Sequence, residues 1–377
     1  MAAALRYGEF LFSLLALAFF TGLQVHVANY LIGEPLQETL TSLIRYSVVA
    51  GSFLLLLFRW RQSLFVAHRA CLLWLLVILD AASYFWSEIP DWTYLSIRGE
   101  LLPMVLFGLY FGSRYCLREQ LQILAPFFIM SAIGSFLVVF LLPEVGKHPL
   151  TEFDGAWRGL YGHKNGLSAY MSISVLAQLS ILLSPKKENI INPKLAWIGL
   201  ALSVALILLS TSATGLLLLV FLFTLLLLYR RYRWQGKRSV LVLNIGIGLG
   251  VVAIILVILN WGLLLAALGK DPTLTSRALI WENGFSFWLD KFFLGYGRDA
   301  FWNPDLPYAY QIGSKIAFNY LPPHAHNGFL DTALEVGIIG LGLFIAGLVL
   351  SLIRVFGWPI LDPVPPCFGR LASCVCS

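Results

Sequence analysis

The sequence predicts an all-α protein, a polytopic transmembrane bundle of about ten spans with a large external loop that contains short helices. Composition is the first reason, since 59% of residues are hydrophobic, only 12% are charged and the mean hydropathy is +0.79, which is typical of membrane proteins. The second reason is pattern. The apolar runs are unbroken and approach the about 20 residues that a helix needs to cross a bilayer, whereas a barrel would show short alternating segments.

The expected spans follow the apolar runs in chain order, at 9–29, 39–58, 70–86, 97–113, 121–142, 166–184, 195–211, 213–230, 239–265 and 327–353. We interpret the first as a retained signal-anchor helix, because Val25-His26-Val27-Ala28 is only a weak cleavage site. The spans show no internal repeat and no broken helices in matching halves, the pattern of alternating-access transporters. We therefore predict one membrane domain over 1–353, followed by a cytoplasmic tail at 354–377.

Positive charges place alternate loops on one side of the membrane. Lys and Arg gather in every second loop, which the positive-inside rule assigns to the cytoplasm: Arg59, Arg61, Arg69, Arg114, Arg118, Lys186, Lys187, Lys194, Arg230, Arg231, Arg233, Lys237, Arg238 and Arg354. Topology thus explains most of the net charge of +6, and we expect no nucleic-acid partner. The long loops at 143–165 and 266–326 lie outside and carry most of the polar chemistry.

Metal and nucleotide chemistry find no support in the sequence. The five cysteines show no metal-ligand spacing, and no Gly-rich nucleotide-binding loop occurs in a suitable context. The two histidines of the segment His324-Ala325-His326 form only a weak ligand set for a metal-dependent hydrolase. We therefore expect no cofactor and no metal.

The shorter external loop ends in a candidate phosphate-binding segment, Trp157-Arg158-Gly159 followed by His163-Lys164-Asn165. Arg158 offers a planar fork for bidentate contact with phosphate, and Lys164 a mobile point charge. The helix expected to start at 166 adds the positive end of its dipole. Anchoring to lipid headgroups is the competing interpretation.

The large external loop offers two more cations. Arg277 follows Thr275-Ser276 at an expected helix start, where a cation is unfavourable to the dipole and implies an anion nearby, either a substrate or an acidic side chain. Arg298 follows Gly295-Tyr296-Gly297, which predicts a tight turn that either presents this cation to a ligand or is only structural. The Trp and Tyr residues of this loop suit either an interfacial aromatic belt or stacking on sugar rings.

Two imidazoles, His324 and His326, lie at the membrane surface just before the last span. Histidine is the side chain with an ordinary pKa nearest neutrality, which makes this pair a candidate proton acceptor. Asn327, Asp331 and Glu335 follow at helical spacing on one face, and Asp331 is well placed to orient an imidazole. Charged residues within other spans, Arg45, Asp80, Arg98 and Glu100, are expected to pair inside the bundle.

Taken in order, several of these motifs resemble the O-antigen ligase/polymerase family, and most closely its exopolysaccharide polymerase branch. The resemblance covers about 150 to 345 and rests on Trp157-Arg158-Gly159, His163-Lys164-Asn165, Thr211-Ser212-Ala213-Thr214, Leu274-Thr275-Ser276-Arg277, Gly295-Tyr296-Gly297, His324-Ala325-His326-Asn327-Gly328 and Glu335-Val336-Gly337-Ile338-Ile339-Gly340. The family's arginines match Arg158 and Arg277, and its histidine best matches His326. Family members usually continue through further spans after the one ending near 353, so a truncated or altered C-terminus is one interpretation of the tail.

The resemblance implies a multi-pass glycosyltransferase of the bacterial inner membrane whose active site faces the periplasm. The donor would be a glycan on undecaprenyl diphosphate, and the acceptor a sugar hydroxyl of lipid A-core or of a lipid-linked repeat unit, with membrane lipid around the protein. Arg158, Lys164, Arg277 and Arg298 would hold the diphosphate, because preorganised cations stabilise developing negative charge. His326 would act as the base, with His324 second and Asp331 or Glu335 orienting it, in one inverting displacement. The alternative function is a transporter or flippase of lipid-linked sugars.

Overall fold

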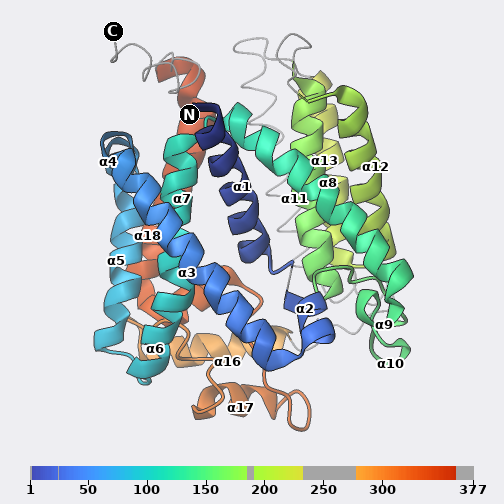
Figure 1. Cartoon of the computed structure of the whole chain (residues 1–377). Coiled ribbons are helices and arrows are strands. Elements are labelled where there is room, and N and C mark those ends of the chain that lie inside the picture. The colour runs from blue at the N-terminus through green and yellow to red at the C-terminus, as the bar shows by residue number, and fades with distance from the viewer. Residues whose placement is uncertain (1, 24, 185–190, 232–276, 362–377) are drawn as a thin grey trace. The chain divides into compact units, whose positions relative to one another are not determined.

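The computed structural model describes residues 2–23, 25–184, 191–231 and 277–361. The span expected at 239–265, the external loop up to 276 and the tail beyond 361 lie outside these ranges. The described helices, in chain order, are α1 (Ala2–Thr21), α2 (Val25–Ile32), α3 (Glu34–Phe58), α4 (Trp60–Arg69), α5 (Cys71–Ala82), η1 (Ser83–Phe85), α6 (Pro90–Ser96), η2 (Ile97–Leu101), α7 (Leu102–Arg114), α8 (Leu117–Leu141), α9 (Pro143–Gly146), α10 (Leu150–Phe153), α11 (Lys164–Leu183), α12 (Pro193–Leu209), α13 (Ala213–Arg231), α16 (Arg277–Asp290), α17 (Pro307–Gly313) and α18 (Gly328–Leu361). The all-α prediction is confirmed (Figure 1).

Long apolar helices make this a multi-pass membrane protein. Among the described residues, five helical stretches are long and apolar enough to cross a bilayer, namely Glu34–Phe58, Pro90–Arg114, Leu117–Leu141, Lys164–Leu183 and Gly328–Ser351. The number rises to seven if each of two bent helix pairs counts as one span, and shorter apolar helices occupy Pro193–Leu209 and Ala213–Thr224. The expected number of ten spans is therefore not confirmed.

The first predicted span, 9–29, is wrong as a continuous helix, because the chain turns by 80° between α1 and α2. Gly22 takes a left-handed φ of 65°. Its N–H donates to the Phe19 carbonyl and the N–H of Leu23 to the Ala18 carbonyl, the Schellman pattern that ends a helix on glycine. The apolar run continues past this point, so hydropathy alone does not reveal the turn.

The described chain divides into two compact units. Of the described residues, the first unit contains those within 2–63 and 103–231, and the second contains 64–102 and 277–361. The single membrane domain expected over 1–353 stays a prediction.

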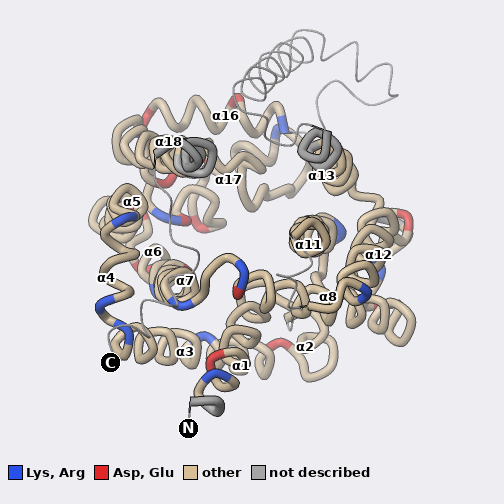
Figure 2. The backbone as a smooth tube through the Cα atoms, turned by 90° about the horizontal axis from the view of Figure 1, so that it is seen from above, with Lys and Arg blue, Asp and Glu red and all other residues tan. Residues whose placement is uncertain are grey.

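Helix α11 forms the centre of the first unit, among α8, α12 and α13 (Figure 2). Its buried Leu167, Met171 and Val175 pack in one core with Phe127 and Phe128 of α8. Small and polar residues let α11 and α12 approach closely, a common device between membrane helices. The Ser203 hydroxyl donates to the Ser174 hydroxyl at 2.7 Å, and a Cβ on Gly199 would lie 2.9 Å from Gln178 Cδ.

A buried carboxylate joins three segments of the first unit. Glu9 accepts from Arg59 Nη2 at 2.7 Å and from Arg114 Nε at 2.7 Å, and the Glu9 side chain is only 2% exposed. Arg59 and Arg114 were both assigned to cytoplasmic loops by charge. Their shared partner Glu9 brings both arginines to the same end of the unit, whereas the cytoplasmic location of that end stays a prediction.

In the second unit, α18 packs against α5 and α16 and is interrupted at Val336 and Gly337, whose backbone angles are not helical. The interruption turns the carbonyls of Leu334 and Glu335 toward the preceding loop. They accept the N–H groups of Tyr296, at 2.7 Å, and Gly297, at 2.9 Å. The segment 292–298 is thus held to α18 by backbone hydrogen bonds.

Replacing Gly337 with alanine is expected to destabilise the second unit by at least about 2 kcal/mol, because a side chain adds both backbone strain and overlap. The φ of Gly337 is 66°, and a Cβ there would lie 2.1 Å from the Phe293 carbonyl oxygen. Gly342→Ala is the matched control in the same helix, since nothing lies within 4 Å of its Cβ. Thermal unfolding in detergent measures the effect, and equal midpoints for the two variants would contradict it.

Candidate functional site

Arg158 lies in the middle of the loop that connects α10 to α11 in the first unit. Its guanidinium donates from Nε to the Val145 carbonyl at 3.0 Å and from Nη2 to the Glu144 carbonyl at 2.9 Å. Its backbone N–H donates to the Gly146 carbonyl at 2.9 Å. These bonds fix the side chain against α9, and a fixed guanidinium is better suited to hold phosphate than a mobile one.

Two imidazoles cap the N-terminus of α11. His148 Nε2 accepts the N–H of Lys164 at 3.0 Å, and His163 Nδ1 accepts the N–H of Asn165 at 3.1 Å. The two rings lie 5.0 Å apart between centroids. Lys164 Nζ lies 4.4 Å from the centre of the Phe153 ring. The predicted phosphate-binding segment thus folds as a compact group of basic side chains at the start of a membrane helix.

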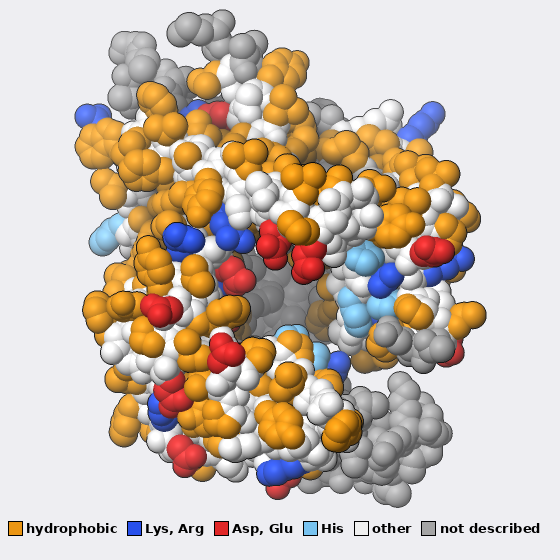
Figure 3. Space-filling view, turned by 60° about the horizontal axis from the view of Figure 1, so that its bottom comes forward, with side chains coloured by type: hydrophobic (Ala, Val, Ile, Leu, Met, Phe, Trp, Pro, Cys, Tyr) orange, Lys and Arg blue, Asp and Glu red, His pale blue; other side chains and the backbone are white. Residues whose placement is uncertain are grey.

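This group, which we call the α11 cationic cluster, consists of Arg158, Lys164, His148 and His163. Burial, and then the charges of His163, Arg158 and Lys164, lower the pKa of His148 to about 4. Burial is the larger cause of this lowered pKa, and the neighbouring basic side chains add to it. Figure 3 shows histidine side chains gathered beside Lys and Arg on the face that comes forward in that view.

Stability is expected to fall as the pH decreases through the window set by His148. The folded pKa of about 4 lies below the ordinary value of about 6.5, so the unfolded chain takes up the proton first. The contribution of His148 to the free energy of unfolding is therefore complete above about pH 6.5 and is lost by about pH 4. His148→Gln, whose side-chain oxygen can replace Nε2 as the acceptor for the Lys164 N–H, should flatten this part of the pH profile of unfolding, and an unchanged slope would contradict the assignment.

A second motif of the first unit packs on the same segment. Ser212 Oγ, between α12 and α13, donates to Asn165 Oδ1 at 2.9 Å, and the N–H of Trp157 donates to the Leu209 carbonyl at 3.3 Å. Thr211 takes a left-handed φ of 49°. The motif Thr211-Ser212-Ala213-Thr214 therefore has a role in holding the start of α11.

The second candidate group lies in the second unit, on the loop that enters α18. His324 and His326 are exposed, and their ring centroids lie 4.1 Å apart. Asp331 reaches this loop through its backbone, since Oδ1 accepts the N–H of Ala325 at 2.8 Å and the indole N–H of Trp302 at 2.9 Å. The predicted proximity of Asp331 to the histidines thus takes the form of a bond to the residue between them.

Arg277 begins α16, a helix that packs against this loop and α18. Trp281, one turn further along, donates its indole N–H to the Ala325 carbonyl at 2.8 Å, and a Cβ on Gly284 would lie 3.2 Å from Leu330. Residues 277, 281 and 284 share one face of a helix. Arg277 therefore begins the face of α16 that packs on the His324–His326 loop.

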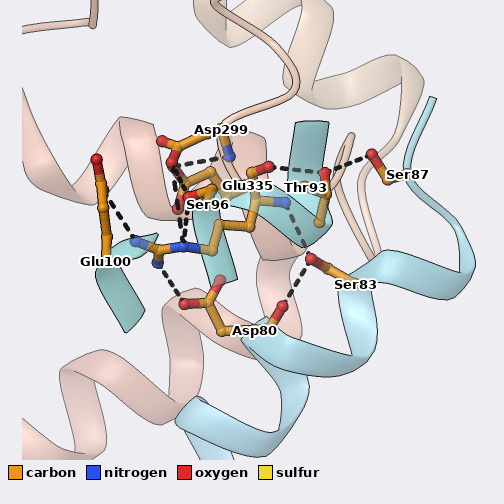
Figure 4. Close-up of polar contacts among 9 residues, drawn as sticks. Asp80, Ser83, Ser87, Thr93, Ser96, Glu100, Asp299 and Glu335 are labelled. Atoms are coloured by element: carbon orange, nitrogen blue, oxygen red, sulfur yellow. Dashed lines mark hydrogen bonds and ion pairs between the residues drawn. The ribbon is translucent and has the colours of Figure 1, made fainter. Parts of the chain in front are cut away.

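Arg298 has carboxylate partners on several segments of the second unit (Figure 4). Its Nη1 lies 2.6 Å from Asp80 Oδ2 and its Nη2 3.5 Å from Glu100 Oε2, while Nε donates to Ser96 Oγ at 3.0 Å. Burial opposes the charged form, but Asp80 and the neighbouring acids outweigh it and raise the pKa of Arg298.

Glu335 belongs to the same group, which we call the Arg298 cluster. It accepts the N–H of Asp299 at 3.4 Å, and Figure 4 shows it beside Asp299 and Ser96. Asp299 in turn accepts from the Ser96 hydroxyl. The contacts of Arg298 and Glu335 favour a role in joining α5, η2 and α18, whereas the diphosphate role of Arg298 and the orienting role of Glu335 stay predictions.

Sequence patterns did not identify His148, Trp281 or Trp302 as parts of these groups. His148 stands apart from the motif it caps. Trp281 occurs among the residues that carry the family resemblance but has no predicted role of its own, and Trp302 belongs to the general aromatic content of the loop. Within the described ranges, no group of three or more His, Cys, Asp or Glu side chains is placed to hold a metal ion.

The long apolar helices define a multi-pass membrane protein. The basic cluster at the start of α11 and the histidine pair before α18 are its candidate sites for an anionic substrate. In the comparison with known proteins, residues 198–345 match the family model described as O-Antigen ligase, and the resemblance to this family is confirmed. The exopolysaccharide production protein ExoQ of Rhizobium meliloti (strain 1021) is 36% identical over 93 residues, which are 23% of this chain and 20% of that protein. The match thus spans about a fifth of the length of that curated relative.

Proposed function

We propose that the chain is a glycosyltransferase that moves a glycan from undecaprenyl diphosphate to a sugar hydroxyl, as an O-antigen ligase or an exopolysaccharide polymerase. The observation that carries the proposal is that the matched region 198–345 contains the exposed histidine pair on a loop fixed by Asp331 and Trp281. A rigid loop is what a base needs in order to meet its substrate in a defined geometry.

The chemistry would be a single displacement. The acceptor oxygen attacks the anomeric carbon, the bond to the diphosphate oxygen breaks, and the diphosphate leaves with the electron pair. His326 would take the proton of the acceptor hydroxyl, a contribution of about 10²–10⁴-fold. Arg158, Lys164 and Arg277 are the cations proposed to carry the charge of the diphosphate. One displacement inverts the anomeric configuration.

The proposed location is the bacterial inner membrane, with the reaction on the periplasmic face. The distribution of Lys and Arg supports it, because the loops that hold the α11 cationic cluster and the histidine pair alternate with the positively charged ones. The acceptor would be lipid A-core for a ligase, or another lipid-linked repeat unit for a polymerase.

The test is glycan transfer by purified protein in liposomes, with an undecaprenyl-diphosphate oligosaccharide, a chelator and no nucleotide. Growth of longer lipid-linked chains would support a polymerase, and labelling of lipid A-core a ligase. Absence of transfer with either acceptor, while the donor still binds, would contradict the proposal. Movement of an intact fluorescent donor across the liposome membrane would then favour a transporter.

A further inference from the structure

The residue between the two histidines is held at both of its backbone polar atoms. Ala325 donates its N–H to Asp331 Oδ1 at 2.8 Å and accepts the Trp281 indole N–H at its carbonyl at 2.8 Å. Ala325 itself is fully buried. The Trp302 indole binds the same Asp331 oxygen at 2.9 Å. Two elements of the second unit, α16 and α18, thus fix the position of this loop.

The residue that follows is in an uncommon conformation. His326 has a φ of 54°, in the left-handed region that non-glycine residues seldom occupy and that persists only where the surroundings impose it. Its backbone N–H donates to Nδ1 of His324 at 3.0 Å. The His324 side chain therefore closes a small turn around Ala325, as an Asn or Asp side chain does when it accepts the N–H two residues further on.

This hydrogen bond also defines the chemistry of the His324 ring. A ring nitrogen that accepts a hydrogen bond carries no proton, so the neutral His324 ring holds its proton on Nε2. Neither nitrogen of that tautomer is then an available acceptor, since Nδ1 is occupied and Nε2 is protonated. The structure thus commits the Nδ1 atom of His324 to the turn and distinguishes this ring from that of His326.

We infer that His324 is a positioning residue whose Nδ1 holds His326 in the left-handed turn that presents the His326 imidazole, and that His326 alone is the base. This inference rests on the proposed function and gives His324, which the sequence ranks second to His326 as a base, a positioning role instead. Asp331 and Trp281 support the same turn through Ala325.

The test compares two variants that differ in one acceptor atom. His324→Asn keeps an oxygen that accepts the His326 N–H, and His324→Leu keeps bulk without an acceptor. We expect His324→Asn to stay within about 3-fold of the native kcat, and His324→Leu to lose about 10- to 100-fold in kcat with little change in the KM of the donor, since misplacing a reactive group by 1 Å costs about 10²-fold. Equal loss in both variants would show that the His324 imidazole itself is required, and full activity of both would show that it positions nothing. Either result overturns the inference.

A second measurement separates this inference from the proposed function. Amide hydrogen exchange of His326, followed by NMR, should be slow in the native protein and in His324→Asn and fast in His324→Leu. The ¹⁵N spectrum of His324 should show the Nε2–H tautomer. Native protein that transfers no glycan but shows this pattern would contradict the proposed function and leave the turn established. Fast exchange in the native protein, or an Nδ1–H tautomer, would overturn the inference whatever the activity.

Discussion

Replacing His326 with alanine is expected to lower the turnover of glycan transfer by about 10²–10⁴-fold, the range that a positioned general base contributes. The loss should appear in kcat, because the imidazole acts on the acceptor hydroxyl in the transition state, whereas the cations proposed to bind the donor are unchanged. The assay is transfer from an undecaprenyl-diphosphate oligosaccharide in liposomes. Binding of a fluorescent donor to the same preparation shows whether the first step is intact.

His68→Ala is the control for this substitution. His68 is an exposed histidine in the last turn of α4, a segment with the positive charge of a cytoplasmic loop, and it should retain native turnover. A fully active His326→Ala would show that this imidazole is not the base. Lost donor binding in that variant would instead place His326 among the binding residues.

Replacing Arg298 with methionine is expected to destabilise the second unit by about 3–5 kcal/mol, the cost of removing one partner of a buried ion pair. Asp80 lies 2.6 Å from the guanidinium, and both side chains are 12% exposed. Without Arg298, the carboxylates of Asp80, Asp299 and Glu335 would share one region with no cation among the contacts described above. Thermal unfolding of the purified protein in detergent measures the loss.

A double substitution decides between the structural role of Arg298 and the predicted role in diphosphate binding. Asp80→Leu combined with Arg298→Met replaces the pair with apolar groups, which commonly restores most of the stability lost by breaking a buried pair. We expect the double variant to unfold at a higher temperature than Arg298→Met alone and to bind donor as the native protein does. A stable Arg298→Met variant with weakened donor binding would support the diphosphate role instead.

Some of the fold follows from the sequence because the bilayer imposes a simple rule. Apolar runs of sufficient length must be helices that satisfy their own backbone, so the all-α class and the long spans at 121–142 and 166–184 were predictable, and α8 and α11 correspond to them. The turn at Gly22 was missed because the hydropathy continues across it, although a glycine within an apolar run is a recognisable signal for a helix end.

The sequence by itself determined the helical class, the alternation of charged loops and the motifs that the family match supports at 198–345, because all of these depend on local composition and spacing. Only the tertiary structure decided which groups meet. Arg298 binds Asp80, which is 218 positions away in the chain. Asp331 accepts a hydrogen bond from the backbone N–H of Ala325, whereas its sequence spacing predicts that it orients an imidazole. Such contacts depend on how helices pack and where α18 is interrupted, and neither the 3.6-residue period nor the hydropathy of a segment contains that information.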